Sequence, residues 1–242
     1  MPFTEAGRWE LTAFAPIQIN SKFTFHAGAA LELAYHIREN LAAQIGVGFN
    51  PVAWQSSLTE ELITKVKQEP LAANALLLQA DALAGLEFMP VYGKLTVFDG
   101  KILRLGFYLN AGVGAGKTRL ELRPSTSDRG RSFGDTGYRP VAELGVGVRA
   151  FIGQSFTVRL ELRDLVYSAY VSRVNGCTHA DALAISSSGA NATVSGGCNI
   201  GAFGSSDPDI KGNGAIAADQ LHDPSADVIN NVAFFGGISY LF

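Results

Sequence analysis

The sequence carries little charge and has no long uninterrupted hydrophobic run. An apolar helix needs about 18 residues to cross a bilayer, and the closest stretch, residues 71–93, is interrupted by Asp81, Glu87 and Pro90. A transmembrane helix is therefore not expected. Charged residues make up only 17% of the chain and the formal net charge is −3. Nucleic acid is not an expected partner because no basic patch is present. Residues 1–7 have neither a cationic start nor an apolar core, so we expect no signal peptide in this chain.

Cysteine and histidine are also scarce. The only two cysteines, Cys177 and Cys198, lie in a long segment rich in Gly, Ser, Asn and Asp. Two cysteines this close in an exported chain predict one disulfide, worth about 3 kcal/mol in the chain-entropy model. The four histidines show no ligand spacing, so no metal site is predicted, although His179 and Asp181 could touch a metal. No cofactor is expected.

What the sequence does contain is a repeat of two residues. In the last segment, Val232, Phe234 and Ile238 alternate with the polar or small Asn231 and Gly237, as the pleat of a β-strand requires when its two faces meet different surroundings. The same alternation recurs in eight segments: residues 9–17, 28–37, 41–50, 82–97, 103–114, 141–152, 156–163 and 227–242. Strands of about ten residues with this repeat are typical of membrane barrels. We predict an all-β fold, a single eight-stranded antiparallel transmembrane β-barrel over residues 1–242.

The segments between the strands alternate in length. Short turns are expected at 36–40, 98–101 and 153–155, and longer loops at 20–26, 51–78, 116–137 and 173–226. An even number of strands places both termini on the periplasmic side, with the short turns there and the long loops outside. Pro90 predicts a bulge in its strand. Residues 57–68 predict a short amphipathic helix, which could lie on the membrane surface or pack over the barrel mouth.

The inward face of the predicted barrel carries charges of both signs. An eight-stranded barrel is only wide enough for side chains to fill, and an unpaired buried charge costs several kcal/mol. Because acids and bases balance, we expect a salt-bridged plug rather than an ion pathway. The predicted network consists of Glu10, Glu32, Glu87, Lys94, Arg104, Glu143, Arg149, Arg159, Glu161 and Arg163.

Several motifs resemble known proteins. Gly237, Tyr240 and Phe242 resemble the closing-strand signal that the outer-membrane assembly machinery reads in bacterial barrels, with Phe235 where that signal usually has a polar residue. The segments Tyr35–Ala42, Leu58–Leu62, Pro90–Leu95, Tyr108–Gly114 and Val158–Tyr167 resemble the myxobacterial-type outer-membrane β-barrel family, a small barrel of the OmpA/OmpX kind. The resemblance spans roughly residues 9–172 and the last strand. It implies an outer-membrane location, with membrane lipid and the assembly machinery as partners.

Three other motifs resemble ligand-binding or catalytic sites. Ala111–Thr118 fits a relaxed phosphate-loop pattern, but that site needs a helix directly after it, whereas Arg119–Pro124 keeps the strand repeat. Asp207–Asn213 faintly resembles a calcium loop, although Lys211 occupies a ligand position. Glu143 and Glu161 could form a hydrolase pair, but no Ser/His/Asp set accompanies them. No enzyme activity is expected.

The function that these patterns favour is structural or binding. The segment 173–226 is too polar to build a core, yet it carries the predicted disulfide. We expect it to serve as an outer platform that anchors a cell-surface assembly through a protein partner. The alternative is a narrow channel for ions or small solutes, and a membrane enzyme is a third class.

Overall fold

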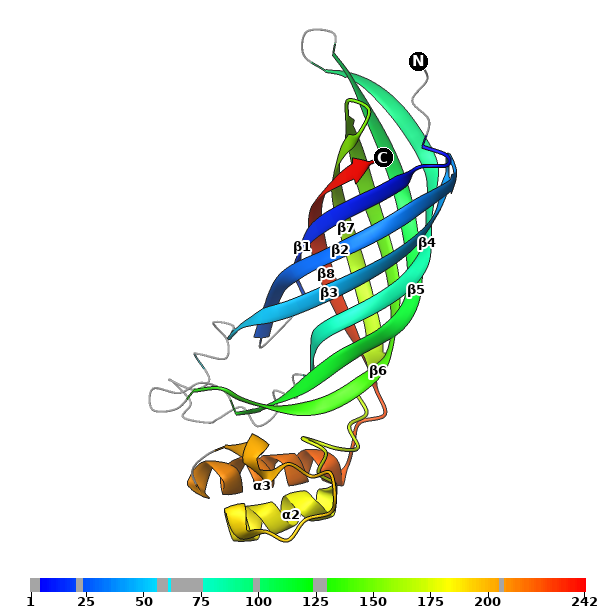
Figure 1. Ribbon diagram of the computed structural model, residues 1–242. Coiled ribbons are helices and arrows are strands. Elements are labelled where there is room, and N and C mark those ends of the chain that lie inside the picture. Colours follow the sequence, from blue (N-terminus) through cyan, green and yellow to red (C-terminus); the bar gives the residue numbers. More distant parts are fainter. Residues whose placement is uncertain are drawn as a thin grey trace.

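The computed structural model describes residues 5–20, 24–55, 61, 76–97, 101–123, 130–204 and 207–242. Eight antiparallel strands, in chain order, close a barrel in which β1 also pairs with β8 (Figure 1). The strands are β1 (Trp9–Gln18), β2 (Thr24–Arg38), β3 (Leu41–Gln55), β4 (Leu76–Val97), β5 (Lys101–Arg123), β6 (Ser132–Ile152), β7 (Phe156–Ser168) and β8 (Val228–Leu241). The predicted all-β, eight-stranded antiparallel barrel is confirmed.

The two-residue repeat sorts side chains between the two faces of the wall. Burial in β1 alternates residue by residue, with Glu10, Thr12 and Phe14 inside and Trp9 and Leu11 outside. The inner face combines long polar side chains with glycines, because the bore is narrow. A Cβ added to Gly147 would lie 2.5 Å from the Tyr108 ring. Glycine at that position therefore lets the large side chain of the neighbouring strand lie across the wall.

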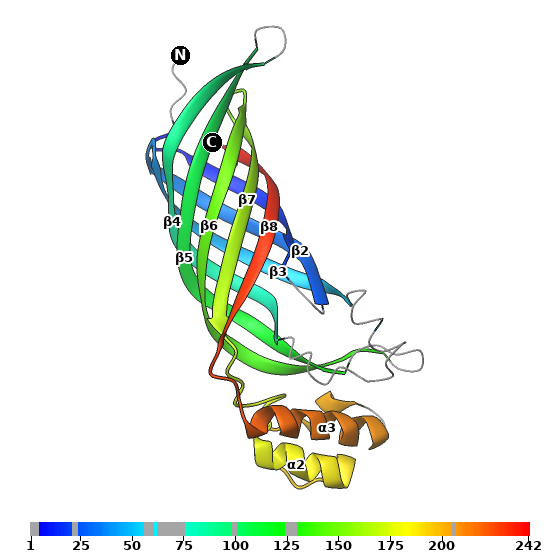
Figure 2. The same ribbon diagram turned by 180° about the vertical axis from the view of Figure 1, so that it is seen from behind.

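Three strands are much longer than the rest. β4, β5 and β6 have 22, 23 and 21 residues, against 10 in β1. The β4–β5 hairpin projects past the end where both termini lie, here called the terminal end, and β5–β6 projects at the opposite, helical end (Figures 1 and 2). A register shift between Phe88 and Val91 confirms the bulge predicted at Pro90.

The longer strands correct several predicted loop boundaries. β3 continues to Gln55 and β4 begins at Leu76, so both strands enter the predicted 51–78 loop. β5 continues to Arg123 and β6 begins at Ser132, which shortens the predicted 116–137 loop. The phosphate-loop motif lies entirely inside β5 and no helix follows it, so the nucleotide-binding interpretation does not hold. The predicted helix at 57–68 lies outside the described residues except for Glu61, which is helical.

The segment between β7 and β8 is not an irregular loop. It contains α2 (His179–Ser188), two 3₁₀ turns, η3 (Gly189–Asn191) and η4 (Ile200–Phe203), and α3 (Asp207–His222). Together, residues 171–226 are called the helical unit. The prediction that this segment cannot build a core was wrong, because its few apolar side chains are gathered by the two helices: Ile185, Phe203, Ile210 and Leu221 are all buried. The calcium-loop interpretation also fails, because residues 207–213 begin α3. No helix of the described residues is long and apolar enough to cross a membrane.

Candidate functional site

Three buried arginines form the centre of the lumen. Arg149 lies on β6, Arg159 and Arg163 lie on β7, and their positions alternate with outward apolar residues. The Arg159 guanidinium is fully buried. It donates to Glu87 and ion-pairs with Glu161 at 2.9 Å. Two further carboxylates, those of Glu32 and Glu10, lie 3.4 and 3.6 Å from its Nη1. One guanidinium thus compensates four acids from four strands.

The other two arginines extend this network along the barrel axis. Arg149 ion-pairs with Glu87 at 2.6 Å and with Glu10 at 3.2 Å. Arg163 ion-pairs with Glu32 at 2.8 Å and Glu143 at 3.3 Å, and it also donates to Glu161. Because each shared carboxylate touches two guanidiniums, the lumen is crosslinked into one buried unit, here called the plug. Glu143 and Glu161, the pair considered for hydrolysis, are both held by Arg163 within it.

Uncharged side chains complete the plug. The Tyr108 hydroxyl donates to Glu161 at 2.6 Å and accepts from Arg159 Nε at 3.0 Å. Asn110 donates to the second Glu161 oxygen at 2.9 Å. The Arg163 guanidinium lies 4.8 Å from the Phe14 ring and 4.7 Å from the Phe235 ring, distances at which cation–π attraction operates. The alternation already placed Tyr108 and Asn110 on the inner face, but their roles depend on which acid lies opposite.

The terminal end of the plug is closed by a turn before β1 that sequence reasoning missed. Gly7, at φ 79°, reverses the chain, so that Glu5 is buried 3.1 Å from Arg149 and 3.4 Å from His36. His36 also lies 2.8 Å from Glu10. Arg8 fastens the turn by donating to the carbonyls of Gln154 and Leu241, at 3.0 and 2.9 Å. No periodic signal marks this turn, because it lies outside the strands.

Two predicted members stand apart from the plug. Lys94 lies on the projecting β4–β5 hairpin and is exposed, since β3 pairs with β4 only as far as Phe88. Arg104 is half-buried, opposite Phe151. The ion pairs of the plug therefore join six carboxylates (Glu5, Glu10, Glu32, Glu87, Glu143 and Glu161) to three guanidiniums and His36 within the described part of the chain. Eight of the ten predicted network residues therefore lie in the plug, and Glu5 and His36, which were not predicted, complete it.

The helical unit is stapled at its base. Cys177 and Cys198 form the predicted disulfide, closing a sequence separation of 21 residues. Directly after Cys177, Thr178 and Asp181 form a capping box that starts α2. The hydroxyl and backbone N–H of Ser195 and the backbone N–H of Thr178 donate to the Asp181 carboxylate. These hydrogen bonds hold the pKa of Asp181 well below its usual range.

Polar contacts fasten the helical unit to the β5–β6 projection. Arg123 ion-pairs with Asp209 at 2.7 Å, and the Ser132 hydroxyl donates to Asn213 at 3.1 Å. The backbone N–H of Asp135 donates to the Asn175 side chain at 2.8 Å, and its carbonyl accepts from the Asn175 N–H at 2.7 Å. The helical unit is therefore held to the barrel by side chains as well as by its two connections.

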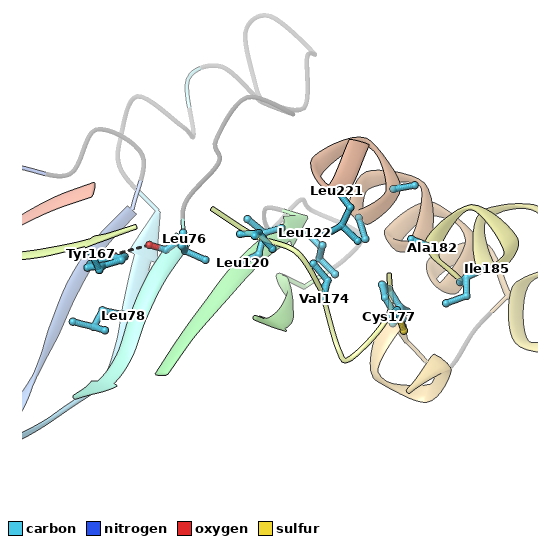
Figure 3. Close-up of a cluster of buried hydrophobic side chains, with 14 of the residues drawn as sticks. Leu76, Leu78, Leu120, Leu122, Tyr167, Val174, Cys177, Ala182, Ile185 and Leu221 are labelled. Carbon is cyan, nitrogen blue, oxygen red and sulfur yellow. Dashed lines mark hydrogen bonds between the residues drawn. The ribbon is translucent and has the colours of Figure 1, made fainter. Parts of the chain in front are cut away.

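A continuous apolar cluster lies beneath these contacts. It runs from the barrel wall through β5 into the two helices, as Figure 3 shows for Tyr167, Leu122, Val174 and Ile185. Val174 is fully buried, and a Cβ added to Gly134 would lie against it. At the barrel end of the cluster the Tyr167 hydroxyl donates to the Leu76 carbonyl at 2.9 Å. Toward the helical end, the inner face of the barrel changes from charged to apolar side chains. This apolar part can therefore pack against α2 and α3.

Of the predicted assembly-signal residues, Gly237 and Tyr240 lie on the closing strand β8, and Phe242 follows its last residue. Tyr240 and Phe242 face outward, and the Tyr240 ring lies 5.1 Å from Phe156 and 6.2 Å from Phe242. Gly237 faces inward and leaves room for the Phe14 ring. Their role in assembly stays a prediction. On the helical unit, the His179 ring hydrogen-bonds to the Ala218 carbonyl and lies edge-to-face with the His222 ring, with centroids 5.4 Å apart. No three His, Cys, Asp or Glu side chains of the described residues gather as ligands of one metal ion.

Three solved outer-membrane proteins have similar structures. The N-terminal β-barrel domain of OprF from Pseudomonas aeruginosa matches with 9% identity and a TM-score of 0.39, over 98% of each chain. Neisserial surface protein A matches with 11% identity and a TM-score of 0.44, over 98% of each chain. Ail, the attachment invasion locus protein of Yersinia pestis, matches with 10% identity and a TM-score of 0.35, over 97% of each chain. These similarities are too distant to carry an argument about function.

No family model matches the chain, and no curated protein matches it either. The resemblance to the myxobacterial-type outer-membrane barrel family therefore stays a prediction.

Proposed function

We propose that this chain is an integral outer-membrane β-barrel with a closed lumen that presents the helical unit as a rigid docking platform for a cell-surface protein partner. The observation that carries this proposal is the combination of a crosslinked plug inside the wall with a stapled unit fastened outside it. The plug disfavours transport through the lumen, and the disulfide of the helical unit favours contact with a protein partner.

The outer wall supports placement in a lipid bilayer. Large apolar side chains cover it on every strand, and many are more than half exposed, including Val113 at 68%, Ile238 at 63% and Leu144 at 62%. Such a continuous apolar surface would be unstable in water. Near the terminal end the outward rings of Trp9 and Tyr35 lie 4.9 Å apart, as in the aromatic girdle of a membrane barrel. Because every strand pairs with two neighbours in a closed ring, the wall suits an outer membrane.

The plug supports a non-conducting role. Arg149 and Arg159 have no exposed surface, and the guanidiniums bridge acids from several strands. An ion would have to displace these crosslinks to pass. We therefore expect negligible conductance in planar bilayers. A large, steady, ion-selective current from the unaltered protein would instead support the narrow channel.

The helical unit supports a binding role because it is ordered before any partner arrives. Preordering lowers the conformational entropy cost of association. Its free surface includes Ala180, Leu183 and Ser187 on α2, with Leu183 49% exposed, and Lys211 and Asp219 on α3. A protruding leucine among small and polar residues suits contact with a folded protein surface.

The decisive experiment removes the platform and keeps the barrel. Residues 172–226 are replaced by a short Gly/Ser bridge between Val171 and Asp227, with Leu120→Ser and Leu122→Ser to remove the apolar surface that the excision uncovers. We expect the shortened barrel to keep its heat-modifiable mobility in SDS and to lose the protein that co-purifies with the intact chain in mild detergent.

A point variant makes this test sharper. Leu183→Asp changes only an exposed side chain, so it should leave the helical unit folded and still weaken association. Gln154→Asp, in the exposed turn between β6 and β7, introduces the same charge away from the helical unit and provides a matched control. If the excised barrel keeps every partner of the intact protein, the platform function is refuted.

A further inference from the structure

The turn that closes the terminal end of the plug lies outside the strand ladder of the barrel. Its residues 5–7 are here called the latch. The Gly7 N–H donates to the His36 carbonyl at 2.7 Å, and the two N–H groups before it each donate to the Glu39 carboxylate at 3.2 Å. Because the pairing of β1 with β2 begins at Trp9, the latch can undock while the barrel stays closed.

The buried part of the latch is the Glu5 side chain. Its carboxylate lies 3.1 Å from Arg149 and 3.4 Å from His36 Nδ1, whereas the other two latch residues are exposed. If Glu5 leaves, Arg149 keeps its ion pairs with Glu10 and Glu87. Docking of the latch therefore depends on one ionisable side chain, and undocking leaves the crosslinks of the plug in place.

The contacts of His36 require a proton at this position. Its Nδ1 faces Glu5 at 3.4 Å and its Nε2 faces Glu10 at 2.8 Å. A neutral imidazole donates from only one of its nitrogens, so its other nitrogen would present a lone pair to a carboxylate. Both contacts are favourable together only when the group holds one more proton, on the ring or on a carboxylate. The undocked latch has no such requirement, because His36 then faces Glu10 alone.

Burial of Glu5 acts in the same direction. Glu5 precedes β1 and so lies outside the membrane-spanning strands. Burial raises the pKa of its carboxyl group from 4.5 to about 7, although Arg149 and His36 oppose this effect. The docked state thus binds a proton more tightly than the undocked state, so docking is strongest below pH 4.5 and weakens as the pH rises to about 7. The charged and titratable groups around Glu5 are Arg149 on β6, His36 on β2, Glu10 on β1, Glu87 and Tyr92 on β4, and Glu39 in the turn after β2.

We propose that residues 5–7 form a proton-controlled latch, which covers the terminal end of the plug while the Glu5–His36 contact holds a proton and undocks when that proton is lost. Gly7, at φ 79°, provides the hinge. Arg8 donates to two backbone carbonyls of the barrel, so the base of the latch stays in place in both states. The latch lies at the end of the barrel opposite the helical unit (Figure 1), and its action is independent of docking by that unit.

The test measures hydrogen exchange of the Gly7 amide by NMR, on the folded protein in detergent micelles. Each rate is divided by the intrinsic exchange rate at the same pH, which gives a protection factor. This factor reports docking, because the Gly7 N–H is bonded to the His36 carbonyl in the docked latch. We expect it to fall between pH 4.5 and 7, by at most roughly 300-fold, the factor that the two pKa values of Glu5 allow.

Two variants assign this fall to Glu5. Glu5→Gln mimics the protonated side chain, so it should keep the protection of the unaltered protein at pH 4.5 over the whole range. Glu39→Gln is the matched control: it removes an exposed carboxylate that bonds the latch backbone, so it should lower protection at every pH and retain the fall. Heat-modifiable mobility in SDS verifies that each variant has a closed barrel.

Three results would overturn the proposal. The first is constant protection of Gly7 in the unaltered protein from pH 4.5 to 7. The second is a fall of the same size in Glu5→Gln, which would assign the titration to another group. The third is loss of protection at every pH in Glu5→Gln, which would mean that docking needs the ionised carboxylate.

Discussion

The plug should be the main polar determinant of barrel stability, and Arg159→Met tests this directly. Methionine fills a similar volume without charge, so the change removes the guanidinium that Glu87, Glu161, Glu32 and Glu10 share. Breaking a buried ion pair by removing one partner costs about 3–5 kcal/mol. The total stability of a folded domain is about 5–15 kcal/mol, so this loss would be a large fraction of it.

The position of the neighbouring arginines sets the magnitude within that range. Glu161 and Glu32 keep Arg163, whereas Glu87 and Glu10 keep Arg149. Because every acid retains one guanidinium, we expect a loss near the lower limit, about 3 kcal/mol, and not a sum over four pairs. Arg163→Met should cost at least as much, since among the plug's ion pairs Glu143 touches only Arg163.

The measurement is urea unfolding of the barrel in lipid vesicles, followed by tryptophan fluorescence. At a slope of about 1–3 kcal/mol per molar urea, the expected loss moves the midpoint by roughly 1–3 M. Arg38→Met is the control. It removes an arginine from an exposed position at the end of β2, so the urea midpoint should change little. Adding Glu87→Gln to Arg159→Met should restore part of the loss, because it neutralises a buried carboxylate that has lost one of its two guanidinium partners. If Arg159→Met unfolds at the same urea concentration as the unaltered barrel, the plug does not stabilise it.

Three predictions concern the helical unit. Cys177→Ser with Cys198→Ser should destabilise it by about 3 kcal/mol, seen as faster proteolysis of residues 172–226 without loss of the heat-modifiable barrel. Gly214→Ala should destabilise it by about 1–3 kcal/mol, because the new Cβ would lie 2.7 Å from Ile185 Cγ2. Asp181→Asn should weaken α2 by about 1 kcal/mol at neutral pH, because an amide accepts the four hydrogen bonds of the carboxylate less well.

The glycine and aspartate predictions each have an internal control. Gly212→Ala on α3 places its Cβ in open space, so it should stabilise the helix by about 0.5–1 kcal/mol. Equal effects of the two glycine substitutions would contradict the proposed packing. For Asp181 the sign follows from its lowered pKa: the stabilisation is complete above the unfolded pKa of about 3.9 and disappears as the pH falls through the folded value. Helical circular dichroism should therefore decline in strong acid, and the Asn variant should lack that transition.

Strand identity and facing followed from the sequence because both depend on a local property. Successive side chains of a strand point to opposite faces, so alternation in each segment predicted which residues enter the lumen before any partner was known. Tyr108, Asn110 and the arginines of β6 and β7 were placed correctly in this way. The bulge at Pro90 was also predictable, because proline lacks the N–H that a regular ladder needs.

Strand length and lumen charge did not follow from the sequence, because they depend on neighbouring strands. Lys94 lies opposite Arg104 beyond the bulge of β4, yet it is exposed because β3 pairs with β4 only as far as Phe88. Glu5 lies outside any strand, yet the Gly7 turn buries it against Arg149. These two differences change which charged residues belong to the plug.

The helical unit shows the same division between local and tertiary information. The sequence by itself determined that two cysteines would be joined and that residues 173–226 lie between two barrel strands. Only the tertiary structure decided that this segment folds, because its sparse apolar residues are sufficient when β5 contributes Leu120 and Leu122 to the same cluster. Alternation is fixed within each strand by backbone geometry, whereas burial and charge pairing are fixed between elements by the closure of the barrel.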